Sequence, residues 1–338
     1  MCRVHEGRGR STRFASRRVD KSVRTLPTPE DVVAAAARIA PWIRRTPIVR
    51  VQGPGARPVV LKLESLQRSG SFKLRGALNK LLRLGKDARA GVITASGGNH
   101  GLGLAWAGWL LGVPVQVCVP STVPAIKRQA LAAAAAEVQI IDGGYPDAER
   151  AARNRARAEG RAYVHAYDDA DVVAGQGTAL LELIEDAPDV GTLVVAVGGG
   201  GLAAGATLAA GGRRVVGVEP YGVPTMYNAL RAGKPVRLDA IESIAADSLG
   251  AGLAGDIPFR LCKAGLDRVE LVEDAALLDA QRWLWEHLRL VVELGAAAGL
   301  AALANGQLDG DPAPIGILLC GGNADPGRLS PPASPVGS

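Results

Sequence analysis

Lys73 stands in an unusual local sequence, RSGSFKLRGALNK (residues 68–80). Small residues occupy positions 69–71 before it, and the aromatic Phe72 is its direct neighbour. A lysine becomes nucleophilic when burial or a nearby positive charge lowers its pKa, and Phe72 and Arg75 could supply these two effects. The small residues would leave room for a planar ring beside the backbone. The sequence therefore predicts a reactive, buried amine, with a solvated lysine on an amphipathic helix as the alternative.

Four consecutive glycines lie in the segment VGGGGLAAG (residues 197–205), between a strand-like run and a helix-like run. Backbone N–H groups at the start of a helix bind phosphate groups well. A simple turn needs only one or two glycines, since each glycine costs chain entropy. The segment therefore predicts a phosphate-binding loop.

The same loop also fits a different phosphate ligand. Gly198, Gly200 and Ala203 match the pattern GxGxx[GA] of dinucleotide-binding enzymes. Glu219 ends the next strand-like run, where an acid that binds the ribose of NAD would lie. An NAD-dependent dehydrogenase that uses the 198–203 loop and Glu219 is therefore an open alternative.

A second turn from strand to helix, TASGGNHGLG (residues 94–103), carries the polar residues Ser96, Asn99 and His100. Polar groups beside open backbone suit an anion or a substrate carboxylate, whereas an ordinary helix cap with glycine packing is the alternative. Glu293, in VVELGAAAGLAAL, is expected to be either a buried carboxylate or a helix N-terminal cap. Cys320, in ILLCGGN, indicates core packing when it is taken alone.

Strand-like and helix-like segments alternate along most of the chain, which is typical of parallel sheets covered by helices on both faces. The predicted strands are 91–96, 114–119, 138–142, 163–167, 192–197, 215–219 and 315–320. The predicted helices are 28–40, 100–112, 125–137, 146–159, 202–210 and 274–288. Ligands bind such sheets at the carboxyl ends of the strands, and the polar residues and glycine loops described above fall at those ends.

Composition excludes several classes of protein. The chain has 338 residues, of which 48% are hydrophobic and 21% charged, as expected for a globular protein with a large core. The longest apolar stretch, residues 101–120, is broken by Gly112 and Pro114, so no membrane span is predicted. The first 24 residues hold eight basic and two acidic residues, which leaves 31 of each in the rest of the chain. The body is therefore neutral, and no nucleic-acid partner is expected.

Cysteine and histidine usage points to a reduced protein without a metal site. The four cysteines, Cys2, Cys118, Cys262 and Cys320, are far apart and form no CxxC pair. The four histidines are likewise isolated. We therefore expect reduced thiols, no metal ligands and a cytoplasmic location.

Several motifs in a fixed order resemble the serine/threonine dehydratase family, the fold-type II enzymes that use pyridoxal 5′-phosphate. The likeness runs from about Thr28 to about Asp325. Its segment SFKLRGA also separates this branch from the cysteine synthases, which carry a different sequence around the lysine. The motifs are LKLESLQRSGSFKLRGA, ASGGNHGLGLA, GQGTALLEL, VGGGGLAAG, GVEP, IAADSL and LCGGN.

The resemblance implies a role for each candidate residue. Lys73 would be the catalytic residue and form the Schiff base with the cofactor, Phe72 would pack on the pyridine ring and Asn99 would bind its hydroxyl. Cys320 would face the ring nitrogen, while Ser96, Asn99 and His100 would hold the substrate carboxylate. The implied cofactor-binding residues are Phe72, Lys73, Asn99, Gly198, Gly199, Gly200, Gly201, Leu202, Glu293 and Cys320.

The resemblance also implies a fold like that of the tryptophan synthase β chain, with two three-layer α/β/α domains and largely parallel sheets. A small domain, 91–160, would be inserted into a large cofactor-binding domain formed by 26–90 and 161–325. A basic extension, 1–25, and a tail, 326–338, are expected to be disordered. Relatives of this kind lead us to expect a homodimer or homotetramer.

The implied reaction is elimination of water from a β-hydroxy amino acid such as L-threonine or L-serine, giving a 2-oxo acid and ammonia. Gly97 stands where related serine racemases have a serine that acts from the opposite ring face, so poor racemisation is expected. A serine racemase-like enzyme is the remaining alternative within this family. Glu219 matches a cation-binding glutamate of those racemases, but Thr225 replaces their aspartate, and no metal ligand is assigned.

Overall fold

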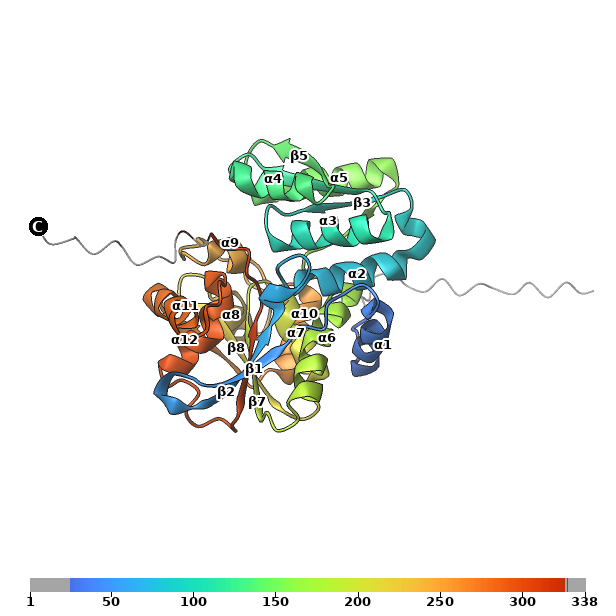
Figure 1. Cartoon of the computed structure of the whole chain (residues 1–338). Coiled ribbons are helices and arrows are strands. Elements are labelled where there is room, and N and C mark those ends of the chain that lie inside the picture. Colours follow the sequence, from blue (N-terminus) through green and yellow to red (C-terminus); the bar gives the residue numbers. More distant parts are fainter. Residues whose placement is uncertain (1–24, 326, 328–338) are drawn as a thin grey trace, which may run out of the picture.

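The computed structural model describes residues 25–325 and residue 327 (Figure 1). The predicted basic extension and tail therefore lie outside the described residues, apart from Thr25 and Gly327. In the described part of the chain, no helix combines the length and the apolar character that crossing a membrane requires.

A six-stranded sheet forms the larger half of the protein. It is parallel except for its edge strand β1, which pairs with β2 in the antiparallel sense. Its inner strands are almost fully buried, as expected when helices cover both faces. The strand order is β1 (Ile48–Gln52), β2 (Pro58–Leu63), β10 (Ile315–Leu319), β7 (Thr192–Ala196), β8 (Arg214–Pro220) and β9 (Arg268–Val272).

Helices lie on both sides of this sheet (Figure 1). One side carries α1 (Pro29–Ile39), α6 (Ala170–Asp186), α7 (Gly201–Ala209) and α10 (Asp256–Gly265). The other side carries α11 (Asp274–Leu288) and α12 (Ala298–Ala304). The short helices α8 (Thr225–Ala232) and α9 (Ala246–Leu249) follow β8.

A four-stranded, fully parallel sheet forms the smaller half. Its order is β5 (Glu137–Ile141), β4 (Val115–Pro120), β3 (Val92–Ala95) and β6 (Ala162–Tyr163). Helix α5 (Tyr145–Glu159) covers one face, and α3 (Asn99–Leu111) and α4 (Ala125–Ala133) cover the other (Figure 1). Helix α2 (Lys73–Leu84) packs against both α6 and α3, and so joins the two halves.

Two α/β units with largely parallel sheets confirm the predicted fold class. The four-stranded sheet extends to Tyr163, past the predicted boundary at residue 160, while the division of the chain into domains stays a prediction. The strand predicted for 163–167 is wrong beyond Tyr163. There the backbone N–H groups of Tyr167 and Asp168 donate to Nδ1 of His165 (3.2 and 2.8 Å), and this local turn replaces the sheet ladder.

Three cysteines can be compared with the prediction of reduced thiols. Cys118, Cys262 and Cys320 are buried and free, as predicted, whereas Cys2 lies outside the described residues. Cys118 lies in β4, Cys262 in α10, and Cys320 directly follows β10. They behave as small apolar side chains in the packing.

A buried ionic network anchors α2. The side chains of Arg75 and Glu64 are fully buried, and their closest charged atoms lie 2.7 Å apart. Arg75 also contacts Glu182 at 2.8 Å, and Glu182 in turn accepts from Lys62 at 2.7 Å. The expectation that Arg75 acts on the Lys73 amine is therefore wrong, because its guanidinium is held by two carboxylates. It instead fixes the first turn of a helix that has no side-chain cap at Phe72.

We expect Arg75→Ala to lower the free energy of unfolding by about 3–5 kcal/mol, because it leaves buried carboxylates without their partner. Urea unfolding measures this change. Arg50→Ala is the matched control, since Arg50 pairs with Asp189 (2.7 Å) at the surface and its loss should change stability far less. Equal effects of the two substitutions would contradict the anchoring role.

Candidate active site

Backbone pairing places Lys73 at the carboxyl end of β10. The N–H of Phe72 donates to the carbonyl of Cys320 (3.0 Å), and the N–H of Gly322 donates to the carbonyl of Gly70 (2.8 Å). A β-bridge between residues 71 and 321 lies between these two bonds. Lys73 is the first residue of α2, directly after the paired segment. The small residues at 69–71 thus allow two backbones to meet closely.

The Lys73 amine faces a cavity from a mostly apolar setting. Its Nζ donates to the carbonyl of Ala166 (3.0 Å) and lies 5.1 Å from the centre of the Phe72 ring. Burial lowers the pKa of the Lys73 ammonium to about 8, with a smaller opposing effect from Cys320. The free amine, which is the nucleophilic form, is therefore accessible near neutral pH.

The glycine loop joins β7 to α7 and requires its glycines. A Cβ on Gly199 would lie 2.5 Å from ring atoms of Tyr167, and a Cβ on Gly201 would lie 2.8 Å from the Cβ of Tyr167. Gly200 adopts a left-handed conformation (φ 90°), which favours glycine. The loop thus leaves backbone N–H groups at the positive end of α7 without side chains over them. Such a cradle fits a phosphate group.

The second loop lies at the N-terminus of α3, another positive helix end. Ser96 Oγ accepts from the N–H of Gly98 (3.3 Å). Nε2 of the buried His100 lies 3.0 Å from Thr94 Oγ1, and within residues 25–325 its Nδ1 has no hydrogen-bond partner. Burial, with help from the Lys73 charge, lowers the pKa of His100 to about 3. The neutral His100 imidazole can therefore act as a hydrogen-bonding group but not as a charge.

Glu293 orients Asn99. The Asn99 Nδ2 donates to Glu293 Oε2 (2.6 Å), while Asn323 donates to Asn99 Oδ1 (2.7 Å). Burial raises the pKa of the Glu293 carboxyl. Its side chain makes no cap hydrogen bond to the short helix that follows, so the cap prediction is wrong, and Glu293 is partly buried.

One cavity of about 870 Å³ brings most of these residues together. Glu293 is the exception among the predicted residues, since it lies behind Asn99 and does not line the cavity. Burial, followed by the Glu293 charge, raises the pKa of the Cys320 thiol to about 12, so this group is neutral. The lining includes Phe72, Lys73, Ser96, Asn99, His100, the 198–202 loop and Cys320.

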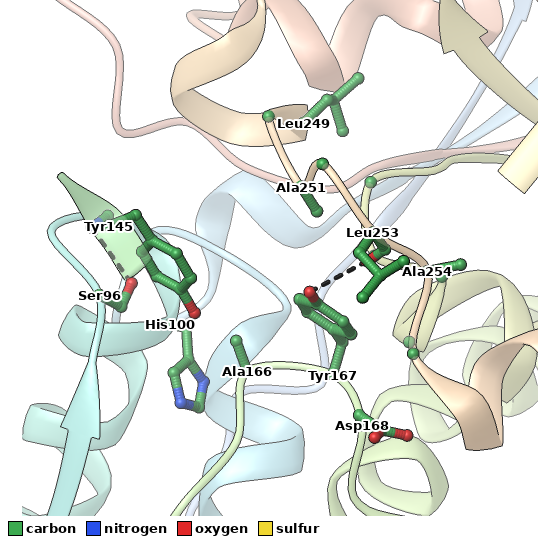
Figure 2. Close-up of a pocket in the computed structure, with 18 of the residues that line it drawn as sticks. Ser96, His100, Tyr145, Ala166, Tyr167, Asp168, Leu249, Ala251, Leu253 and Ala254 are labelled. Atoms are coloured by element: carbon green, nitrogen blue, oxygen red, sulfur yellow. Dashed lines mark hydrogen bonds between the residues drawn. The ribbon is translucent and has the colours of Figure 1, made fainter. Parts of the chain in front are cut away.

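Sequence reasoning missed the wall contributed by α5 and the turn after β6. Tyr145 and Tyr167 line the cavity, and Figure 2 shows Tyr145 close to Ser96 and His100. The Tyr167 hydroxyl donates to the carbonyl of Leu253 (3.1 Å; Figure 2). The polar and aromatic run YVHAYDD at a strand end was a usable signal, because ligands bind at that edge of a parallel sheet.

Glu219 does not take part in this cavity. It is fully buried and accepts hydrogen bonds from the N–H groups of Met226 (2.7 Å) and Tyr227 (2.9 Å) at the start of α8. Burial raises the pKa of Glu219 to about 8. Among the described residues, no three His, Cys, Asp or Glu side chains gather as they would around a metal ion.

Two domains with largely parallel sheets, with a lysine and a glycine loop facing one cavity, are typical of fold-type II pyridoxal-phosphate enzymes. The chain belongs to the pyridoxal-phosphate dependent enzyme family, whose model matches residues 39–321. The predicted cofactor, pyridoxal 5′-phosphate, and the tryptophan synthase β-like fold are therefore confirmed. The NAD-dependent dehydrogenase alternative is wrong, since Glu219 caps α8 and the family uses a different cofactor.

Individual relatives carry different activities. The chain is 36% identical over 272 residues to an L-threonine ammonia-lyase of Thermotoga maritima, covering 79% of this chain and 67% of that protein. It is 36% identical to a phenylserine dehydratase of Ralstonia pickettii, and the match covers 89% of this chain and 94% of that protein. The structure of maize serine racemase is similar with a TM-score of 0.86 at 31% identity, covering 90% and 96%. The chain is thus a fold-type II enzyme of the ammonia-lyase and serine racemase group.

We expect Gly199→Ala to weaken binding of pyridoxal phosphate about tenfold or more, since an added Cβ would displace the Tyr167 ring at a cost of about 1–3 kcal/mol. A spectroscopic titration of the cofactor-free protein measures this affinity. Gly310→Ala is the matched control, because a Cβ there would meet nothing within 4 Å. Unchanged affinity in Gly199→Ala would contradict the assignment of the cradle.

Proposed function

We propose that this protein eliminates water from a β-hydroxy amino acid, such as L-threonine or L-serine, and releases a 2-oxo acid and ammonia. The observation that carries this proposal is the buried Lys73 amine in a cavity that has two helix N-termini for anions. One suits a phosphate and the other a carboxylate. Relatives named as an ammonia-lyase and a dehydratase support the same chemistry.

The residues that would hold the cofactor come from four segments. Lys73 is the amine to which it would be bonded, and Phe72 would pack against its ring. Asn99, fixed by Glu293, would face the ring hydroxyl. The backbone of the loop Gly198, Gly199, Gly200, Gly201 and Leu202 would hold the phosphate.

Bound pyridoxal phosphate supplies an electron sink that makes the Cα proton of an amino acid removable. Lys73, once the substrate amino group has replaced it on the cofactor, would take this proton as the general base, for which its lowered pKa is suited. The neutral Cys320 thiol would face the ring nitrogen and, unlike a carboxylate, provides no negative charge there. The lack of a negative charge beside the ring nitrogen favours early loss of the β-hydroxyl from the substrate. Ser96, Asn99 and His100 would orient the substrate carboxylate at the start of α3.

Serine racemisation is the second candidate, because racemases are among the relatives. It needs a second proton-transfer group on the other side of the substrate. Gly97 supplies no side chain, and a Cβ there would lie 2.5 Å from Val123 Cγ2. The crowding at Gly97 therefore favours the lyase over the racemase.

A single assay separates these activities. The purified protein, loaded with pyridoxal phosphate, is incubated with L-serine, L-threonine and bulkier or acidic 3-hydroxy amino acids. We expect 2-oxo acid and ammonia in equal amounts and little D-serine by chiral chromatography. The Lys73→Ala variant is the blank. Formation of D-serine in excess over pyruvate would contradict the lyase proposal.

A further inference from the structure

The cavity extends beyond the Lys73 amine and the 96–100 loop, since its lining also includes the start of α5 and the 249–254 segment. Its volume of about 870 Å³ lies near the upper end of the range of roughly 300–1,000 Å³ that is common for ligand sites. The space beyond the Lys73 amine and the 96–100 loop therefore has room for a larger substituent on the substrate. The walls of that space indicate the kind of substituent.

Two tyrosines line this space, Tyr145 from the start of α5 and Tyr167 beside the 249–254 segment (Figure 2). Tyr145 is the first residue of α5 and is 40% exposed, with its ring at the cavity (Figure 2). Tyr167 is held rigidly by its hydrogen bond to Leu253 and by the edge-to-face contact of its ring with His165, with ring centres 4.6 Å apart. Both rings present flat, mainly apolar surface to the cavity.

The segment 249–254 forms a second wall, on the other side of the space from Tyr145 in Figure 2. Its side chains are small or apolar, with Leu249, Ala251 and Leu253 at the cavity. Their size leaves space that larger residues would fill, and Leu253 also fixes Tyr167 through its carbonyl. An apolar group that enters between the two walls would lose contact with water on both sides.

Most charged side chains that line the cavity already form hydrogen bonds or ion pairs with other residues. Arg153 donates to Glu149 (2.8 Å), and Asp247 pairs with Lys127 (3.0 Å). Among the described lining residues, Arg237 is the remaining arginine, and it is exposed. Apart from Arg237, the walls therefore offer few positively charged groups that could pair with a second carboxylate on a substrate.

We propose, building on the lyase function above, that the β-carbon of the preferred substrate carries an aromatic ring, held between Tyr145 and the 249–254 segment. The substrate class is thus the 3-aryl-3-hydroxy amino acids. Aromatic rings contact one another favourably in edge-to-face or offset geometry, and an apolar wall on the other side completes the site. Tyr145 is then a specificity-determining residue and takes no part in proton transfer.

The test compares kcat/KM for 3-phenylserine, threonine, 3-hydroxyleucine and 3-hydroxyaspartate in the cofactor-loaded protein. We expect kcat/KM for 3-phenylserine to exceed that for threonine by at least about tenfold. Tyr145→Ala should lower kcat/KM about tenfold for 3-phenylserine alone. Tyr145→Phe should retain the preference, because it keeps the ring. Tyr221→Ala is the matched control, since Tyr221 is 54% exposed and does not line the cavity.

Three results would overturn the proposal. The first is a kcat/KM for threonine or 3-hydroxyleucine that equals that for 3-phenylserine. The second is an equal loss of kcat/KM for all substrates in Tyr145→Ala. The third is a preference for 3-hydroxyaspartate that Arg237→Ala removes, which would instead indicate an acidic substrate. Calorimetry with unreactive L-phenylalanine and L-alanine provides a readout that needs no turnover. If no 2-oxo acid forms from any substrate, the lyase function fails, while tighter binding of phenylalanine that depends on Tyr145 would still support the aromatic site.

Discussion

The position of Lys73 depends on backbone pairing between two segments that lie far apart along the chain. Residues 70–72 bond to residues 320–322 at the end of β10, and α2 starts at the next residue. Arg75, two residues further on, is tied into a buried network with Glu64 and Glu182. The amine is thus fixed between the end of the sheet and the core of the larger half. The partly buried Lys73 amine is thereby held by packing and by its hydrogen bond to the carbonyl of Ala166.

The remainder of the site follows from the geometry of parallel sheets. Helices α3 and α7 each begin at the carboxyl end of a strand, and both point a positive N-terminus towards one cavity. One helix comes from each half of the molecule, and α2 packs between the halves. Two helix N-termini and one amine are thereby held at fixed positions, an arrangement that suits a cofactor with a phosphate and a substrate with a carboxylate.

Much of this could be predicted from the sequence, because alternating apolar runs and consecutive glycines report local geometry directly. The Lys73 segment, the glycine loop and most strands were found in this way. The partners of charged side chains could not be predicted, since they depend on tertiary contacts: Arg75 binds Glu64 and Glu182 instead of acting on Lys73, and Glu219 caps α8. Tyr145 was missed for the same reason, because nothing at the start of α5 shows that the ring reaches the cavity.

The central claim is that Lys73 holds the cofactor through its side-chain nitrogen. The most direct measurement is to supply the purified protein with pyridoxal phosphate, reduce it with borohydride, digest it and locate the stable adduct by mass spectrometry. We expect one modified site, Nζ of Lys73, and no adduct in Lys73→Ala. Modification of a different lysine, or an unmodified Lys73 in protein that retains the cofactor, would contradict it.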